Sequence, residues 1–254
     1  MARLPVLNLA LRSIANRRAT AILTVLTVAI SVMLFLGVEK VRHGARESFE
    51  NTISGVDLIV GARSSPVNLL LYSVFHIGDA TNNITWESYE TVASAPGVAW
   101  TVPISLGDSH RGHRVIGSTP DLFEHYQYGG GRHLEFASGQ PFSDLFGAVI
   151  GAAVAREQGY QTGDEIIVAH GMGAVGFIEH DSNPFTVVGV LAPTGTPLDQ
   201  SVMVTLEAIE AIHLGGATGS GATVSAEELR AMDLTPDQLT AFFVGLDSPV
   251  AALR

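Results

Sequence analysis

Residues 19–38 read ATAILTVLTVAISVMLFLGV, a run of 20 residues without a charged side chain. At the α-helical rise of about 1.5 Å per residue, such a run crosses the roughly 30 Å hydrocarbon layer of a bilayer. A cleavable signal peptide has a shorter apolar region, about 7–15 residues, followed by a small-x-small site. This run leads instead into Val38-Glu39-Lys40-Val41, so it predicts a transmembrane helix that stays as a permanent anchor.

Two other interpretations of the run fit less well. Arg17-Arg18 precede it as in a twin-arginine export signal, but Ala19-Thr20 rather than strongly apolar residues follow directly. A helix buried in a soluble protein would keep a polar face, and the hydroxyl side chains of the run make only a narrow one. Those residues are Thr20, Thr24, Thr27 and Ser31.

Positive charge is concentrated before the run. Residues 1–18 hold four arginines and no acidic residue, a local charge of +4, whereas residues 39–50 mix both signs. Because cytoplasmic flanks carry the excess of lysine and arginine, residues 1–18 are predicted to lie in the cytoplasm. Their spaced apolar residues predict either a helix in the membrane interface or extra turns of the same helix. The arginines are Arg3, Arg12, Arg17 and Arg18.

Beyond the run the helical pattern continues. Apolar residues recur at spacings of three and four through Val41, Ala45, Phe49 and Ile53, and the pattern stops at Gly55. Residues 39–54 are therefore expected to extend the membrane helix as a stalk of about 24 Å at helical rise.

The rest of the chain has the composition of a folded domain. The sequence is 46% hydrophobic and 15% charged, which supplies a substantial core. The net charge of −11 hides an asymmetry, because residues 39–254 carry 10 basic and 25 acidic residues, a net −15. An acidic surface repels phosphate backbones, so no nucleic-acid partner is expected. The absence of cysteine excludes disulfides, thiolate catalysis and zinc-thiolate sites.

Strand and helix patterns alternate at short spacing after Gly55. The mixture predicts an α+β domain over residues 55–254, arranged in two lobes and incomplete at its C-terminus. Expected strands cover residues 57–61, 98–106, 113–117, 148–151, 165–170, 185–191, 201–204 and 242–246, and expected helices cover 86–94, 152–158, 206–213 and 226–232, with 215–221 as a flexible connector.

One glycine motif matches a nucleotide-binding fingerprint in letters only. GMGAVG at residues 171–176 follows an expected strand, but Asn183-Pro184 and another strand arrive before a helix that could meet a pyrophosphate. Lys40, on the stalk, is the only lysine, so no P-loop is possible. The chain is expected to bind no nucleotide cofactor itself.

The histidines do not predict a catalytic or metal site. His110 and His113 are an odd spacing apart, which would put them on opposite faces of an extended strand unless a turn intervenes. His170, or His180-Asp181, would have to complete such a site. Asp108, Ser109 and His110 are sequence neighbours that do not face one another as a triad requires. We therefore predict no catalytic, metal or cofactor residues and no enzyme activity.

Four blocks of the domain resemble a known family. With the basic N-terminal segment, the membrane helix and its stalk, their order and spacing are similar to the first half of the MacB/FtsX/LolC-type ABC transporter permeases. The blocks are ARSSPVNLLLYSVFHIGDATNNITW (62–86), ISLGDSHRGHRVIGSTPDLF (104–123), GAVIGAAVAREQGYQTGDEIIV (147–168) and FTVVGVLAPTGTPLDQSVMVTLEAIEAI (185–212).

The resemblance implies a permease subunit of an export or mechanotransmission system in a bacterial inner membrane. It implies a separate cytoplasmic ABC ATPase that binds the ATP, and a homodimer or a paired permease. Family members carry three further transmembrane helices after this domain, so we expect a chain ending at Arg254 to be an N-terminal fragment or a split subunit. The alternatives are a single-pass anchored sensor or binding domain and, third, an anchored enzyme.

Overall fold

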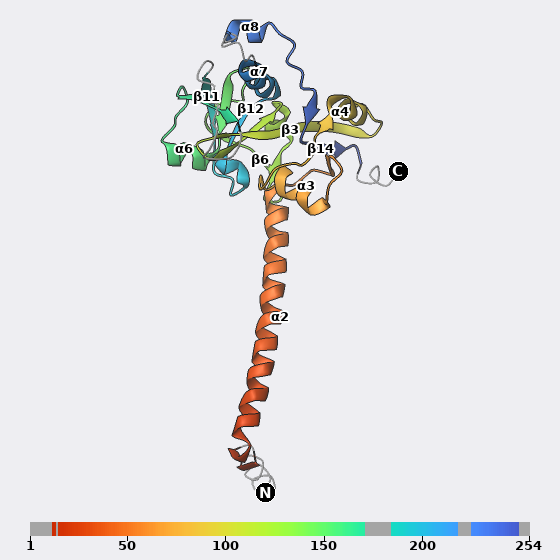
Figure 1. Cartoon of the computed structure of the whole chain (residues 1–254), viewed down its shortest axis with the longest axis vertical. Helices are drawn as coiled ribbons and strands as arrows, with labels where there is room; N and C mark the ends of the chain where they lie inside the picture. The colour runs from red at the N-terminus through yellow and green to blue at the C-terminus, as the bar shows by residue number, and fades with distance from the viewer. Residues whose placement is uncertain (1–11, 14, 171–183, 218–224, 249–254) are drawn as a thin grey trace. The chain divides into compact units, whose positions relative to one another are not determined.

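Helix α2 runs from Arg18 to Thr52 as one unbroken ribbon in the computed structural model (Figure 1). The structure describes residues 12–13, 15–170, 184–217 and 225–248. Contacts divide the chain into two units, Met1–Phe49 and Glu50–Arg254, which are described separately below. This single helix contains the apolar run and residues 39–52 of the expected stalk.

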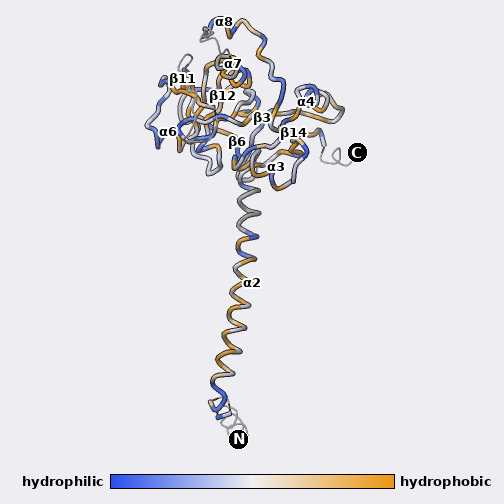
Figure 2. The backbone as a smooth tube through the Cα atoms, in the orientation of Figure 1, coloured by the Kyte–Doolittle hydropathy of each residue, from blue (hydrophilic) through white to orange (hydrophobic). Residues whose placement is uncertain are grey.

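Three of the four hydroxyl side chains of the apolar run are satisfied within the helix. The hydroxyls of Thr24, Thr27 and Ser31 each donate a hydrogen bond of 2.8–2.9 Å to the carbonyl four residues earlier. Such bonds remove the cost of placing a hydroxyl in an apolar medium. Figure 2 shows the run as a largely hydrophobic segment of α2.

The domain is built on a mixed sheet of ten strands. Its main order is β1-β14-β3-β4-β12-β8-β11-β7, with β10 paired to β3 and β9 to β11. The pairs β4/β12 and β8/β11 are parallel, and the other pairs are antiparallel. The strands are β1 Leu58–Gly61, β3 Val98–His110, β4 His113–Ser118, β7 Phe136–Gly139, β8 Gly147–Ile150, β9 Glu165–Ile166, β10 Ala169–His170, β11 Phe185–Leu191, β12 Ser201–Thr205 and β14 Ala241–Leu246.

The sheet is buried on both faces. Val202 and Val204 lie on one face in a cluster that also takes in residues of α6 (Ala152–Gln158) and α7 (Leu206–Ala217). The alternation of strand side chains places Val149 and Met203 on the other face, and both are fully buried as well. The mixed α/β fold is confirmed. Residues 50–254 form one compact unit around this sheet, and the expected division into two lobes stays a prediction.

Local signals in the sequence set most helix ends. The Thr85 side chain caps α4 (Trp86–Ala93), and Gly159 ends α6 in the left-handed conformation. Ser225 and Glu228 form a reciprocal capping box on α8 (Ala226–Arg230). Helix α3 (Pro66–Ser73) was not predicted, although Ser65-Pro66 supplies a cap and a first-turn proline.

Short elements complete the domain. Helix α5 (Asp121–His125) leads into the β5/β6 hairpin, and η1 (Pro197–Gln200) is a 3₁₀ turn before β12. The strand expected over residues 165–170 is two short strands, β9 and β10, that pair with different partners. The remaining strands are β2 Ile84–Thr85, β5 Gln127–Tyr128, β6 Arg132–His133 and β13 Gln238–Leu239.

Candidate functional site: the long apolar helix and its C-terminal anchor

The C-terminal end of α2 is held by the segment around β5. The backbone N–H of Gly129 donates to the carbonyl of Asn51 at 2.9 Å, and the N–H of Ser54 donates to Gln127 at 2.8 Å. The Tyr126 hydroxyl donates to the carbonyl of Thr52. The last carbonyls of a helix have no partner inside it, so these bonds satisfy groups that water would otherwise solvate. Residues 51–54 and 126–129 are called the helix anchor below.

Tyr126 lies at the centre of the helix anchor. It directly follows α5 and is 5% exposed. Burial raises the pKa of its phenol well above the usual value, although a hydrogen bond with Thr196 acts in the opposite direction. The hydroxyl therefore stays protonated and remains a donor. Nothing in the sequence around Tyr126 signalled this role, because its partners lie far away along the chain.

The loop that contains Thr196 is itself held by one carboxylate. The oxygens of Asp199 accept hydrogen bonds from the N–H and hydroxyl of Thr194, at 2.9 and 2.8 Å, and from the N–H of Gly195 at 2.8 Å. The Thr196 hydroxyl accepts from Leu198 N–H at the start of η1. Residues 194–200, called the 194–200 loop, are thus a closed polar network.

The last described strand returns to the first one. Strand β14 pairs antiparallel with β1, and Leu246 N–H donates to the Asp57 carboxylate at 2.8 Å. Asp57 N–H in turn donates to the carbonyl of Val244 at 3.0 Å. The C-terminal end of β14 therefore lies beside the residues that follow α2.

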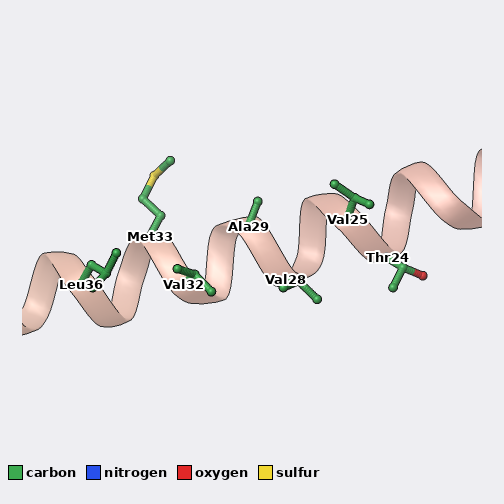
Figure 3. A pocket seen from close by; sticks show the side chains of 7 residues that line it. All are labelled: Thr24, Val25, Val28, Ala29, Val32, Met33 and Leu36. Carbon is green, nitrogen blue, oxygen red and sulfur yellow. The ribbon is translucent and has the colours of Figure 1, made fainter.

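The surface of the apolar run in α2 is uncovered. Figure 3 shows seven side chains pointing away from the helix, among them Val25 and Met33, which are 67% and 72% exposed. Residues Arg18–Gly44 form a helix long and apolar enough to cross a membrane, and it is the one such helix among the described residues. Exposed apolar surface of this extent is typical of a membrane or partner contact.

Comparison with known families decides where the chain belongs. Residues 21–242 match the family model of the MacB-like periplasmic core domain. The chain belongs to this family. The match begins inside the apolar helix and ends at the second residue of β14, so the family model covers most of α2 together with most of the domain.

Two solved structures that match the chain are distant from it in sequence. The periplasmic region of MacB from Actinobacillus actinomycetemcomitans is 12% identical, with a TM-score of 0.44 over 78% of this chain and 81% of that chain. The extracellular domain of the noncanonic ABC-type transporter YknZ from Gram-positive bacteria is 14% identical, with a TM-score of 0.34 over 65% and 74%. No curated protein matches the chain.

The spacing of His110 and His113 separates them only if no turn intervenes, and the structure has a turn between them. They face each other across a two-residue hairpin, since β3 extends to His110 and β4 begins at His113. Arg111 and Gly112 form the turn with positive φ values of 47° and 86°. Odd spacing separates faces only within a single strand, and the turn reverses the direction of the chain.

His110 nevertheless has other partners in the MacB-like domain. Its Nδ1 lies 2.6 Å from the carbonyl of Ile167 and its Nε2 lies 3.1 Å from the Tyr160 hydroxyl. Burial lowers the pKa of His110, while the contact with the Ile167 carbonyl acts in the opposite direction. Both ring nitrogens are thus engaged, and no group of three or more His, Cys, Asp or Glu side chains gathers among the described residues.

The other residues considered for chemistry are dispersed. Asp108 and Ser109 are buried on β3, where they pair in register with His170 and Ala169 of β10. Lys40 lies on α2. The glycine motif at residues 171–176 and His180-Asp181 lie outside the described residues.

A buried arginine fixes the segment that follows α3. Arg114 of β4 is 6% exposed and donates to the Asp79 carboxylate at 2.7 Å and to the Gly78 carbonyl at 2.8 Å. His76 Nδ1 lies 3.1 Å from the hydroxyl of Ser201, which is the register partner of Arg114 on β12. Burial of the ring and the Arg114 charge lower the pKa of His76 to about 4.

The lowered pKa of His76 predicts that the stability of the domain depends on pH. An unfolded chain protonates His76 near its ordinary pKa of 6.5, whereas the folded protein keeps it neutral to about 4. The unfolded state binds more protons in that window, so the free energy of unfolding should fall as pH drops from 6.5 to 4. Urea unfolding of His76→Asn over this range should show a shallower slope than the wild type.

Asparagine suits this position because it tolerates the left-handed backbone at φ 55°. At pH 8 histidine is neutral in both states. The difference in free energy of unfolding between His76→Asn and the wild type at that pH therefore reports packing alone. An unchanged slope between pH 6.5 and 4 would show that His76 does not contribute.

Proposed function

We propose that the chain is the permease subunit of an ABC-type export or mechanotransmission system. In this proposal residues 19–38 cross the membrane, residues 39–54 are the stalk, and the MacB-like domain receives the motion. The observation that carries it is the continuity of α2 from the apolar run to the helix anchor. A helix joined to a domain by hydrogen bonds transmits a displacement that a flexible linker would absorb.

The source of energy in this proposal is a separate cytoplasmic ABC ATPase. The single lysine, Lys40, cannot serve a P-loop, so ATP would bind to that partner rather than to this chain. One membrane helix cannot line a pore. Transport would therefore also require a second copy or a paired permease, together with further membrane helices.

The proposed location is the bacterial inner membrane, with residues 1–18 in the cytoplasm and residues 39–254 outside it. The +4 flank and the uncharged run support this orientation. A reporter that is active only outside the cytoplasm should be active when fused after Arg254, and the protein should stay in the membrane pellet at alkaline pH. Activity of a cytoplasm-only reporter at the same position would reverse the proposed topology.

The test of the function is co-purification from native membranes. Tagged protein should retain an ABC ATPase, and the complex should hydrolyse ATP whereas the purified chain alone should not. The control is the MacB-like domain expressed without residues 1–44, which should retain no ATPase because it lacks the membrane segment. If the full chain also retains none, the single-pass sensor or binding domain becomes the better interpretation.

A further inference from the structure

A small cavity lies between the tip of the β3/β4 hairpin and residues 165–169. Its volume is about 280 Å³. Pockets for drug-sized molecules have volumes of about 300–1,000 Å³, so this cavity suits one smaller molecule. Four polar side chains and two apolar ones provide most of its lining, namely His110, Arg111, Tyr160, Glu165, Ile166 and Ile167.

Two opposite charges line this cavity without pairing with each other. The Arg111 guanidinium has one hydrogen bond to the described part of the chain, a long contact of 3.4 Å with the Gln158 side chain. The Glu165 carboxylate forms no hydrogen bond or ion pair with any residue that the structure describes. Five N–H donors on one side and a carboxylate on the other suit a ligand that carries both charges.

The pair of His110 and Tyr160 adds a fixed hydrogen-bond acceptor to the cavity. The Ile167 carbonyl can only accept, so the Nδ1 of His110, which lies 2.6 Å away, carries the proton. Because burial lowers the pKa of His110, the ring stays neutral at neutral pH and its Nε2 is an acceptor. The Tyr160 hydroxyl therefore donates to Nε2 at 3.1 Å. Its own oxygen is left to accept hydrogen bonds from a ligand.

We propose that this cavity binds a free α-amino acid with an apolar side chain. The Arg111 guanidinium binds the α-carboxylate through paired N–H donors. The Glu165 carboxylate and the Tyr160 oxygen accept hydrogen bonds from the α-ammonium group, and Ile166 and Ile167 form the wall for the side chain. The inference goes beyond the proposed function, and it holds for a permease as well as for a single-pass sensor.

The test is calorimetric titration of the full chain with L-leucine, in nanodiscs of phosphatidylglycerol, which has no ammonium group. L-Leucine should bind. N-acetyl-leucine lacks the ammonium group and leucinamide lacks the carboxylate, so each should bind about tenfold more weakly or worse. Glycine should also bind more weakly, because it lacks the apolar side chain. No saturable binding of L-leucine, or equal binding of all four compounds, would overturn the proposal.

Two variants assign the ends of the ligand to the two charges. Arg111→Asn suits the positive φ of 47° and should weaken L-leucine binding about tenfold while leaving leucinamide binding unchanged. Glu165→Gln should weaken L-leucine binding similarly and leave N-acetyl-leucine binding unchanged. The control is Arg156→Gln, which removes an exposed arginine of α6 outside the cavity lining. Wild-type affinity for L-leucine in both cavity variants would show that the site is wrong.

Phosphoethanolamine distinguishes an amino acid from a lipid headgroup, since it carries both charges but no apolar side chain. It should bind more weakly than L-leucine. Tighter binding of phosphoethanolamine would mean that the cavity takes a headgroup and that the amino-acid assignment is wrong. None of these titrations needs an ATPase, so their failure leaves the proposed function standing, and failure of the co-purification leaves this inference standing.

Discussion

Replacing Ala45 with proline should abolish the ATP-driven output of the assembled transporter while the protein still inserts into the membrane. Position 45 lies inside α2, about two turns before its last residue Thr52 and just past the apolar segment Arg18–Gly44. Proline removes one intrahelical hydrogen bond and clashes with the preceding turn, which costs about 3 kcal/mol in a helix interior and kinks it. A kink at this place separates the membrane segment from the helix anchor without touching the domain core.

The control for this change is Ala45→Ser, which keeps the backbone hydrogen bond. Output can be measured as resistance or export, with expression, alkaline-resistant membrane association and ATPase co-purification measured in parallel. Normal output in Ala45→Pro, with those three properties intact, would show that the stalk is only a tether.

Replacing Gly151 with alanine should destabilise the domain by about 3 kcal/mol, as overpacking of a tight site does. Gly151 is buried, and a Cβ added there would overlap the backbone oxygens of Leu198 and Asp199. Backbone atoms cannot rotate away as a flexible side chain can. The strand β8, the loop and α6 would therefore have to separate, which denaturant unfolding of the chain in detergent would detect.

Gly107→Ala is the matched control for Gly151→Ala. Gly107 lies in β3, where an added Cβ meets no heavy atom within 4 Å. The free energy of unfolding of Gly107→Ala should stay within about 0.5 kcal/mol of the wild-type value. Equal stability of the two alanine variants would show that the loop does not pack against Gly151 in solution.

The parts of the fold that the sequence predicted depend on local signals. The uncharged run fixes α2, and caps such as Thr85 and Gly159 fix helix ends because they act within one turn. The family resemblance is confirmed by the match of residues 21–242 to the family model. Strand limits were less well predicted, since a buried strand such as β3 has no local residue that stops it.

The helix anchor could not be predicted from local patterns. Tyr126 and Thr52 are 74 positions apart, and neither neighbourhood has a pattern that pairs them. The turn between His110 and His113 could not be predicted from local patterns either. It needs a positive φ at Arg111, a value that arginine rarely adopts. Contacts that depend on chain reversal or distant packing are decided by the whole fold.

The pairing of β1 with β14 has a mechanical consequence. The two strands are antiparallel, and the start of β1 at Leu58 lies opposite Val244, near the end of β14. A force that pulled these two ends apart would act across the ladder and open its hydrogen bonds one after another, as a zipper opens, instead of shearing them together. Four residues of β1 offer little resistance to peeling. Asn51 and Ser54 are hydrogen-bonded to the β5 segment, so these bonds would carry part of a force applied along α2. Without them, the β1/β14 pair would be the first part of the domain to open.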